Sequence, residues 1–173
     1  MPSWCIHIAI ASEYIKKHKN EIKDKEEFLK GTIDPDISDN KYESHYDNYK
    51  EKHNGISPFL KKEKVESDYW KGYFLHLVAD DLFYNKIFKK ETEYVENNDL
   101  SFYHDWDCLN KDLIKTYKIE KLLTDRVKKN CEIVNGDPEY IDFTRVKNFI
   151  DGISEVAIEK QIEEININGN PII

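Results

Sequence analysis

The sequence predicts an all-α protein, folded as a single-domain multi-helix bundle. Gly and Pro are scarce, six and five in 173 residues, whereas the helix-compatible residues Lys, Glu, Leu and Ile are plentiful. Eleven Tyr, eight Phe and three Trp provide enough large side chains for a hydrophobic core, which argues against disorder despite the high charge. A chain of this length is also a normal size for one domain.

The first helix is expected over residues 3–18. Ser3 is a suitable N-cap, and Trp4, Ile8, Ala11 and Ile15 form one apolar stripe at helical spacing. His7 lies one helical turn from Trp4 and from Ala11. We therefore expect the His7 side chain to face the interior of the protein.

A second helix is expected over residues 21–30, with Gly31 as its C-terminal stop. The following segment, residues 31–40, is predicted to leave helical structure, because Pro35 disfavours a helical conformation of the residue before it and because Asp, Ser and Asn favour turns. In this predicted turn, Asp36 is flanked by Ile33 and Ile37, which could hold it against the core. Functional groups often lie on loops that a rigid scaffold positions in this way.

The most apolar stretch of the chain, residues 72–84, predicts a buried central helix, which Ser67 or Asp68 caps and which runs to about residue 90. In a helix, His76 and Asp80 are four residues apart and therefore share one face. Gly72 lies one turn before His76, where a missing side chain leaves room for another group. A buried carboxylate is costly unless it is paired, and a metal ion would satisfy both His76 and Asp80.

Ser57-Pro58 is expected to start a short helix, with Ser57 as N-cap, and residues 91–98 are expected to form a short helix or turn. Further helices are expected over residues 101–117, 119–134 and 141–165, with a strong break at 135–138. Residues 1–165 are predicted to form the single helical domain, and residues 166–173 a peripheral tail. The three cysteines, Cys5, Cys108 and Cys131, show neither disulfide-type nor zinc-type spacing.

The net charge of −8 argues against binding to a nucleic-acid duplex, which requires a basic surface. The N-terminal residues lack a basic leader with a long apolar stretch, and no run is long enough to cross a bilayer. A cytoplasmic protein is therefore expected. The sequence makes no prediction of its oligomeric state.

Five residues are the candidates for a metal site, because each is predicted to face inward or to be held against the core. They are His7, Asp36, His45, His76 and Asp80. Imidazole nitrogens and carboxylate oxygens, without thiolates, are ligands that zinc accepts, and manganese or iron also bind such sites.

In order along the chain, the sequence contains Trp4-x-x-His7, Gly31-Thr-Ile-x-Pro-Asp36, Ser44-His45-Tyr46 and Gly72-Tyr-Phe-Leu-His76-x-x-x-Asp80. This ordered set resembles the zinc-dependent phospholipase C family, whose all-helical fold is shared with certain secreted single-strand nucleases. The resemblance covers roughly the first half of the chain. It implies that Asp36, His45, His76 and Asp80 hold one metal, and that His7 binds a neighbouring metal that shares Asp80.

The sequence departs from the family pattern in two places. The secreted phospholipases use the amino group of an N-terminal Trp as a ligand, whereas Trp4 here follows three residues. They also have two further His and a Glu after the central helix, whereas the only later histidine here is His104. One zinc ion, or two at most, is therefore the expectation.

The resemblance implies a metal-dependent hydrolase acting on a small phosphoester. A bound metal lowers the pKa of water towards about 7 and stabilises charge on phosphoryl oxygens. Asp36 is the expected catalytic residue, since it could also orient or deprotonate that water. Asp81 and Tyr73 are candidate partners of the metal ligands, and His104 is a candidate for such a partner or for a second metal.

Two alternatives remain open at this stage. The doublet His104-Asp105, with His76 and either Asp142 or Asp151, fits the pattern of HD-type metal phosphohydrolases, which are also all-helical. The other alternative is a helical binding module that holds a structural metal or none. These alternatives predict different residues at the functional site, and the fold decides which residues meet.

Overall fold

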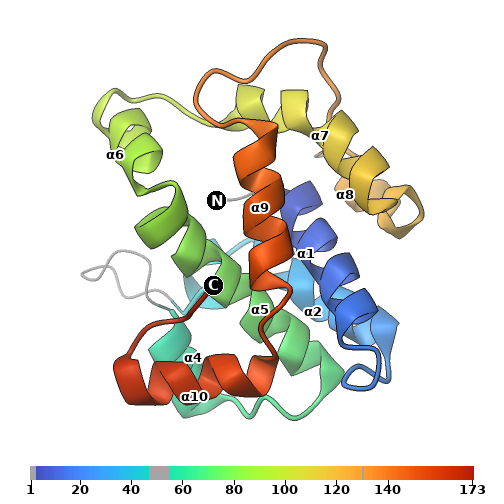
Figure 1. The fold of residues 1–173 in the computed structure, drawn as a ribbon, viewed down its shortest axis with the longest axis vertical. Coiled ribbons are helices and arrows are strands. Elements are labelled where there is room, and N and C mark those ends of the chain that lie inside the picture. The colour runs from blue at the N-terminus through green and yellow to red at the C-terminus, as the bar shows by residue number, and fades with distance from the viewer. Residues whose placement is uncertain (1–2, 47–54, 130) are drawn as a thin grey trace.

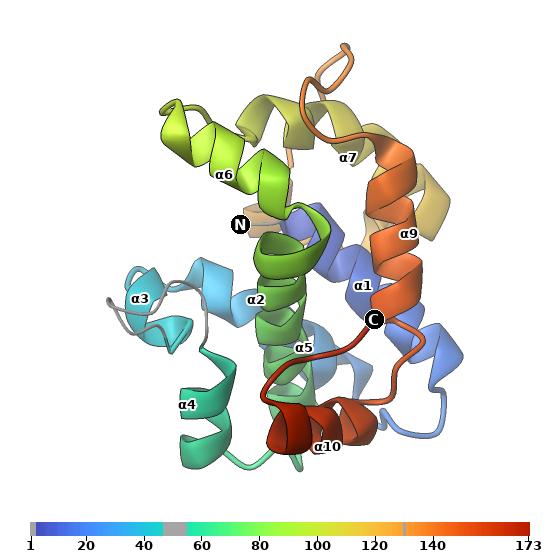
Figure 2. The same ribbon diagram turned by 60° about the vertical axis from the view of Figure 1, so that its left-hand side comes forward.

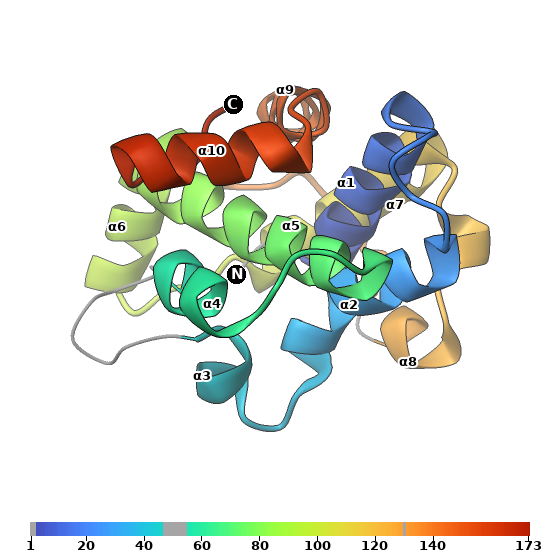
Figure 3. The same cartoon turned by 90° about the horizontal axis from the view of Figure 1, so that it is seen from below.

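Helix α5 (Asp68–Leu82) is the central element of the computed structural model, which describes residues 3–46, 55–129 and 131–173. All residues from Gly72 to Leu82 are buried, as the apolar stretch predicted. The predicted end near residue 90 is wrong, because α5 ends at Leu82 and a π-helical turn follows. The other helices surround α5 in all three ribbon views (Figures 1, 2 and 3). The described residues form an all-helical, multi-helix domain without a β-strand, which confirms the predicted fold class.

The remaining elements range in length from 3 to 15 residues. In chain order they are α1 (Trp4–Lys17), α2 (Lys25–Ile37), α3 (Lys41–Ser44), α4 (Ile56–Lys62), the π-helical turn η1 (Phe83–Ile87), α6 (Lys89–Asn97), α7 (Tyr103–Tyr117), the 3-10 turn η2 (Glu120–Leu122), α8 (Asp125–Lys128), α9 (Phe143–Ile153) and α10 (Ile158–Asn168). In the described part of the chain, no helix combines the length and the apolar character needed to span a membrane.

Side-chain caps define the starts of the two helices predicted most directly. Ser3 accepts a hydrogen bond from the backbone N–H of Ile6 at the start of α1, and Ser67 accepts one from the N–H of Trp70 at the start of α5. Both caps satisfy N–H groups that have no partner within the helix. These starts were predictable because a cap depends only on neighbouring residues.

Helix α2 differs from the prediction, because it runs through both expected breakers. It begins after the N-cap Asp24 and continues through Gly31 and Pro35 to Ile37, so the predicted end at Gly31 and the predicted non-helical segment 31–40 are wrong. Pro35 lies in the last turn, where its missing N–H removes only the bond to the Gly31 carbonyl. Asp36 is consequently a helical residue and not a turn residue.

The two glycines explain why α2 continues. A Cβ atom added at Gly31 would lie 1.9 Å from the carbonyl oxygen of Tyr69 on α5, and one added at Gly72 would lie 2.0 Å from the carbonyl oxygen of Phe28 on α2. Each glycine therefore lets the backbone of the other helix approach closely. The α2–α5 contact is the most extensive between any two elements described, and its burial outweighs the local preference of Gly31 to end a helix.

Two further predicted helices are interrupted. Residue 130 of the expected helix 119–134 lies outside the described residues, and the described part of this range contains η2 and α8 as separate elements. The side chain of Thr124 caps α8 by accepting from the N–H of Val127. The expected helix 141–165 divides into α9 and α10 around Ser154, whose hydroxyl donates to the carbonyl of Ile150. Both breaks follow from side-chain hydrogen bonds that compete with the helical pattern.

The C-terminal residues lie against the rest of the domain. Helix α10 continues to Asn168, beyond the expected boundary at residue 165. Pro171 is buried, and its carbonyl accepts from Lys86 Nζ. The side chain of Gln161 makes two hydrogen bonds with the backbone of Ile172, at 2.6 and 3.0 Å.

The glycine contact leads to a stability prediction. Gly72→Ala should lower the free energy of unfolding by about 1–3 kcal/mol, because the new methyl group would overlap the α2 backbone. In an open helix the same change would be stabilising by up to about 1 kcal/mol. Urea unfolding followed by circular dichroism measures the difference.

The control is Gly136→Ala, where the nearest atom to the added Cβ is 3.4 Å away. This variant should unfold at nearly the wild-type urea concentration. Wild-type stability of Gly72→Ala would contradict the close backbone approach of α2 and α5.

Candidate metal centre

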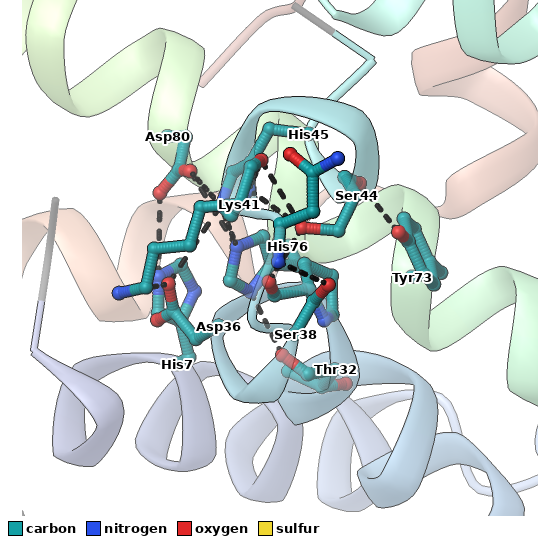
Figure 4. A network of polar contacts seen from close by, with 12 residues as sticks. His7, Thr32, Asp36, Ser38, Lys41, Ser44, His45, Tyr73, His76 and Asp80 are labelled. Carbon is teal, nitrogen blue, oxygen red and sulfur yellow. Dashed lines mark hydrogen bonds and ion pairs between the residues drawn. The ribbon is translucent and has the colours of Figure 1, made fainter.

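Five buried side chains from four parts of the fold converge on one point (Figure 4). His7 comes from α1, Asp36 from α2, His45 from the residue after α3, and His76 and Asp80 from α5. None of the five is more than 9% exposed. They are the same five residues that the sequence put forward, and the fold brings all of them together.

The His76 ring is fixed by α2. Its Nδ1 lies 2.8 Å from the carbonyl oxygen of Thr32, so Nδ1 carries the proton and donates. In the neutral ring the other nitrogen, Nε2, then presents a lone pair. That lone pair points at Asp80, whose Oδ2 is 3.5 Å away, one turn along the same helix.

The His45 ring is fixed in the same way. Its Nδ1 lies 2.7 Å from the carbonyl oxygen of Lys41, the first residue of α3. The short helix is held in place from two sides: the Ser44 hydroxyl donates to the Pro35 carbonyl of α2 at 2.7 Å, and the Tyr73 hydroxyl of α5 donates to the Ser44 carbonyl. The lone pair on His45 Nε2 consequently points into the cluster.

The inward lone pairs lie close together. His45 Nε2 and His76 Nε2 are 3.1 Å apart, and Asp80 Oδ2 lies 3.4 Å from the former and 3.5 Å from the latter. Asp36 Oδ1 lies 3.7 Å from His45 Nε2. Lone pairs at these separations repel one another unless a cation lies between them. A tetrahedral zinc site with bonds of about 2.0–2.1 Å places its ligand atoms roughly 3.3 Å apart, which these spacings approximate.

His7 extends the cluster on the α1 side. Its ring stacks on that of His76, with centroids 3.9 Å apart and planes inclined by 13°, and its Nε2 lies 3.3 Å from Asp80 Oδ1. Both ring nitrogens of His7, together with Asp36 Oδ1 and Asp80 Oδ1, are buried without a hydrogen-bond partner. Buried polar atoms are rarely left in this state. The donor set therefore fits a metal, and the most closely spaced ligand atoms are those of His45, His76 and Asp80.

Two groups of three possible ligands have atoms within 4.8 Å of one another, and Asp36 and Asp80 fall in different groups. One comprises His7, Asp36 and His76, and the other comprises His45, His76 and Asp80. His76 belongs to both. Within the described residues, the cluster could accommodate one ion or two neighbouring ions.

The pKa values of the ligand residues shift in different directions. Burial lowers the pKa of His7 and of His45 below the ordinary value of 6.5, and the charge of His76 lowers both further, against the opposing effect of Asp80. Burial also acts to lower the pKa of His76, but the charge of Asp80 and the hydrogen bond to it outweigh burial, so the pKa is raised. For Asp80, burial acts to raise the pKa, but His76 and His7 outweigh it and hold it well below the ordinary value of 3.8.

The raised pKa of His76 indicates which proton a bound metal would displace. Without a metal, a proton on His76 is the smallest cation that can relieve the repulsion among the lone pairs. This proton can form hydrogen bonds only from His76 Nε2 to its neighbours, so the buried atoms of His7 and Asp36 still lack hydrogen-bond partners. A divalent ion can contact several ligands at once, and its binding displaces this proton.

Three further sequence candidates have other environments. Tyr73 contacts the chain beside His45, since its hydroxyl donates to the Ser44 carbonyl. Asp81 is buried and accepts a hydrogen bond from Asn85 Nδ2 at 2.7 Å. His104 is exposed on α7, where its Nε2 lies 3.6 Å from the sulfur of Cys108.

The doublet His104-Asp105 has a structural explanation. Asp105 is fully buried, and its carboxylate accepts from the backbone N–H groups of Glu139, Tyr140 and Ile141 at 2.8–2.9 Å. Asp142 caps α9 and Asp151 contacts Tyr117 and Lys147. The geometry therefore favours the His7–Asp80 cluster over an HD-type arrangement.

A cavity of about 550 Å³ opens beside the cluster. Asp36 belongs both to the cluster and to the cavity wall, which also includes the aromatic side chains of Trp4, Tyr84, Phe102, Tyr103 and Trp106. Thr92, another wall residue, is buried and its hydroxyl has no hydrogen-bond partner. The cavity is therefore of a size and character suited to a small molecule that is partly apolar.

Sequence reasoning missed Lys41. Its ammonium lies 3.7 Å from Asp36 Oδ1, and the side chain lines the cavity. Figure 4 shows it extending from α3 across the cluster toward Asp36. A lysine on a polar segment carries no local signal of this position, because the contact depends on how α3 folds back onto α2.

The pKa shifts predict how pH affects the metal-free protein. For His7 and His45, whose folded pKa is lowered, stability is present above about pH 6.5 and is lost as pH falls through the folded pKa. For His76, whose folded pKa is raised, stability is present below about pH 6.5 and is lost as pH rises through the folded pKa. The unfolding free energy in chelator should therefore be greatest near pH 6.5.

Urea unfolding between pH 5 and 8 in the presence of a chelator measures this profile. His104→Asn should reproduce the wild-type profile, because the exposed ring lies outside the cluster. A stability that does not change with pH over this range would contradict the described electrostatics.

A scan against protein-family models, a search of the curated proteins and a search of the solved structures find no match for this chain. The resemblance to the zinc-dependent phospholipase C family therefore depends on the order of the ligand residues in the sequence. Any role for the cluster has to be inferred from its own chemistry and surroundings.

Proposed function

We propose that this protein is a metal-dependent hydrolase that cleaves a small phosphoester. The observation that carries the proposal is the meeting of His45 Nε2, His76 Nε2 and Asp80 Oδ2 at 3.1–3.5 Å, with the Nδ1 atom of each ring bound to a backbone carbonyl. Ring nitrogens that are oriented in this way through the opposite nitrogen are typical of metal-ligating histidines.

The ligands proposed for one ion are Asp36, His45, His76 and Asp80, with His7 contributing to a neighbouring ion or to the same site. Zinc is the favoured metal for such ligands, and manganese or iron also suit them. When bound, a divalent ion provides a usable water nucleophile near neutral pH and stabilises negative charge on phosphoryl oxygens.

Asp36 has the position required of the catalytic base. It is the cluster residue that also lines the cavity, and its Oδ1 has no hydrogen-bond partner. It can therefore accept a proton from a water molecule at the boundary between cluster and cavity. Asp80 faces three histidines, at 3.3–3.5 Å, and its role is to orient and balance them.

The cavity supports a catalytic rather than a purely structural metal. A structural zinc site is closed by protein ligands on all sides, whereas a catalytic site keeps a position open to substrate. Here, an unpartnered carboxylate oxygen of the cluster belongs to a residue on the wall of a 550 Å³ cavity. The aromatic wall can hold the apolar part of a substrate whose phosphoester group meets Asp36.

Metal content tests the proposal directly. Protein purified without added metal should contain close to one zinc, manganese or iron per chain by plasma mass spectrometry. His76→Ala removes a ligand from the centre of the cluster and should reduce metal affinity by more than about 100-fold, beyond the effect typical of an outer partner. His104→Ala, outside the cluster, should retain the metal.

Hydrolytic activity should be present with the bound metal and lost when a chelator removes it. Hydrolysis of 4-nitrophenyl phosphate and of bis(4-nitrophenyl) phosphate, measured with and without chelator, distinguishes monoesterase from diesterase activity. Metal retention without chelator-sensitive hydrolysis of either compound would leave a structural metal site and overturn the hydrolase proposal.

The hydrogen bond that holds α3 against α5 provides a second test of the metal site, with a smaller expected effect. Tyr73→Phe removes the hydroxyl that holds the Ser44 carbonyl, next to His45. The His45 ring should then be less well ordered, and metal affinity should fall by about 10-fold, measured by competition with a chromogenic chelator.

Tyr69→Phe is the matched control. Tyr69 lies one turn earlier on α5, and its hydroxyl donates to Asp34 Oδ2 at 3.0 Å, not to α3. The control should bind metal as the wild type does. Equal metal affinities for the two variants would show that α3 does not depend on Tyr73.

A further inference from the structure

The junction between cluster and cavity contains a positive charge, that of Lys41, in addition to the Asp36 carboxylate. Lys41 Nζ lies 3.7 Å from Asp36 Oδ1, and both residues line the cavity. The Lys41 side chain is 49% exposed, whereas that of Asp36 is 2% exposed. Lys41 therefore contacts the buried carboxylate of Asp36 and is also accessible from the cavity.

A charge count indicates what Lys41 does once a metal is bound. Asp36 and Asp80 together carry two negative charges, which one divalent ion balances. In this structure the Lys41 ammonium is paired with Asp36. Once a metal ion neutralises the Asp36 carboxylate, the charge of Lys41 is no longer balanced by that carboxylate. It becomes a surplus positive charge at the edge of the cavity, directly beside the ligands.

The position of Lys41 is set by the same contacts that set the metal ligands. Its carbonyl oxygen accepts the hydrogen bond from His45 Nδ1 at 2.7 Å. Asn40 caps the α3 turn by accepting from the N–H of Glu43. The backbone of Lys41 is therefore held against the cluster, while its flexible stem leaves the ammonium free to turn from Asp36 toward a ligand.

The other charged residues of the cavity wall do not share this position. Lys129 belongs to the segment after α8, and the acids Glu96, Asp107 and Glu132 belong to α6, α7 and the segment after α8. In the ion pairs described for the cluster, the lysine is Lys41, and none of these four wall residues takes part.

We propose that Lys41 binds the anionic phosphoryl group of the substrate and holds it against Asp36 and the metal ligands. This inference rests on the proposed function, since it names the group that receives the phosphoester. A charge-assisted hydrogen bond from Lys41 to a phosphoryl oxygen should strengthen phosphate binding by about 10- to 100-fold.

The probe is inorganic phosphate, titrated by calorimetry into the full chain as purified with its metal. Lys41→Met keeps much of the length of the stem and removes the charge, and it should weaken phosphate binding by about 10- to 100-fold. Its metal content should be unchanged, because removal of a positive charge beside the ligands does not weaken cation binding. Lys41→Arg should recover part of the phosphate affinity.

Lys89→Met is the matched control. Lys89 is also an exposed lysine paired with a carboxylate, 3.9 Å from Glu93, but it does not line the cavity. It should bind phosphate with the wild-type dissociation constant. If Lys41→Met also binds phosphate within twofold of the wild type, or if it loses the metal, the anion-binding role of Lys41 is overturned.

The result separates this inference from the proposed function. If the wild type shows no chelator-sensitive hydrolysis but binds phosphate in a Lys41-dependent way, the hydrolase proposal fails and the role of Lys41 stands. A parallel titration with acetate identifies the anion. Tighter, Lys41-dependent binding of acetate would overturn the assignment of a phosphoryl group.

Discussion

Two imidazole nitrogens and a carboxylate oxygen face one another inside the helical core, and much of the surrounding structure serves to hold them there. His45 Nε2, His76 Nε2 and Asp80 Oδ2 are mutually within 3.5 Å. Each ring is prevented from turning its lone pair away by a hydrogen bond from Nδ1 to a backbone carbonyl. A cation at this point, either a proton or a metal ion, would relieve the repulsion among these lone pairs, and the cluster is therefore the basis of the proposed metal site.

The close contact of α2 and α5 is what makes this arrangement possible. Gly31 and Gly72 let the two backbones touch. As a result, one face of α2 supplies both the Thr32 carbonyl that orients His76 and, one turn later, the Asp36 carboxylate. Short helix α3 then returns over α2 and adds His45. Four elements thus contribute to the cluster, and no two neighbouring residues in the sequence do so.

The function inferred for the cluster depends on its surroundings as much as on its ligands. A cluster enclosed on every side would suit a structural metal. This one shares Asp36 with a cavity wall that combines aromatic side chains with charged ones, among them Lys41. The ligand cluster, the Asp36 oxygen that lacks a hydrogen-bond partner and the Lys41 cation all lie at the wall of a cavity with both polar and apolar residues. This combination is the basis for proposing a phosphoester whose remaining part is partly apolar. The HD-type reading has no comparable support, since Asp105 is occupied by three backbone N–H groups.

The sequence by itself determined the features that depend on neighbouring residues: the all-helical class, the cap at Ser3, and the shared face of His76 and Asp80. It also put forward all five residues of the cluster, partly by resemblance. Only the tertiary structure decided that α2 continues through Gly31 and Pro35, and that Lys41 lies beside Asp36 at the cavity. The physical reason is that helix ends and cavity walls depend on burial against distant segments, and this burial outweighs local preferences that are worth about 1 kcal/mol each.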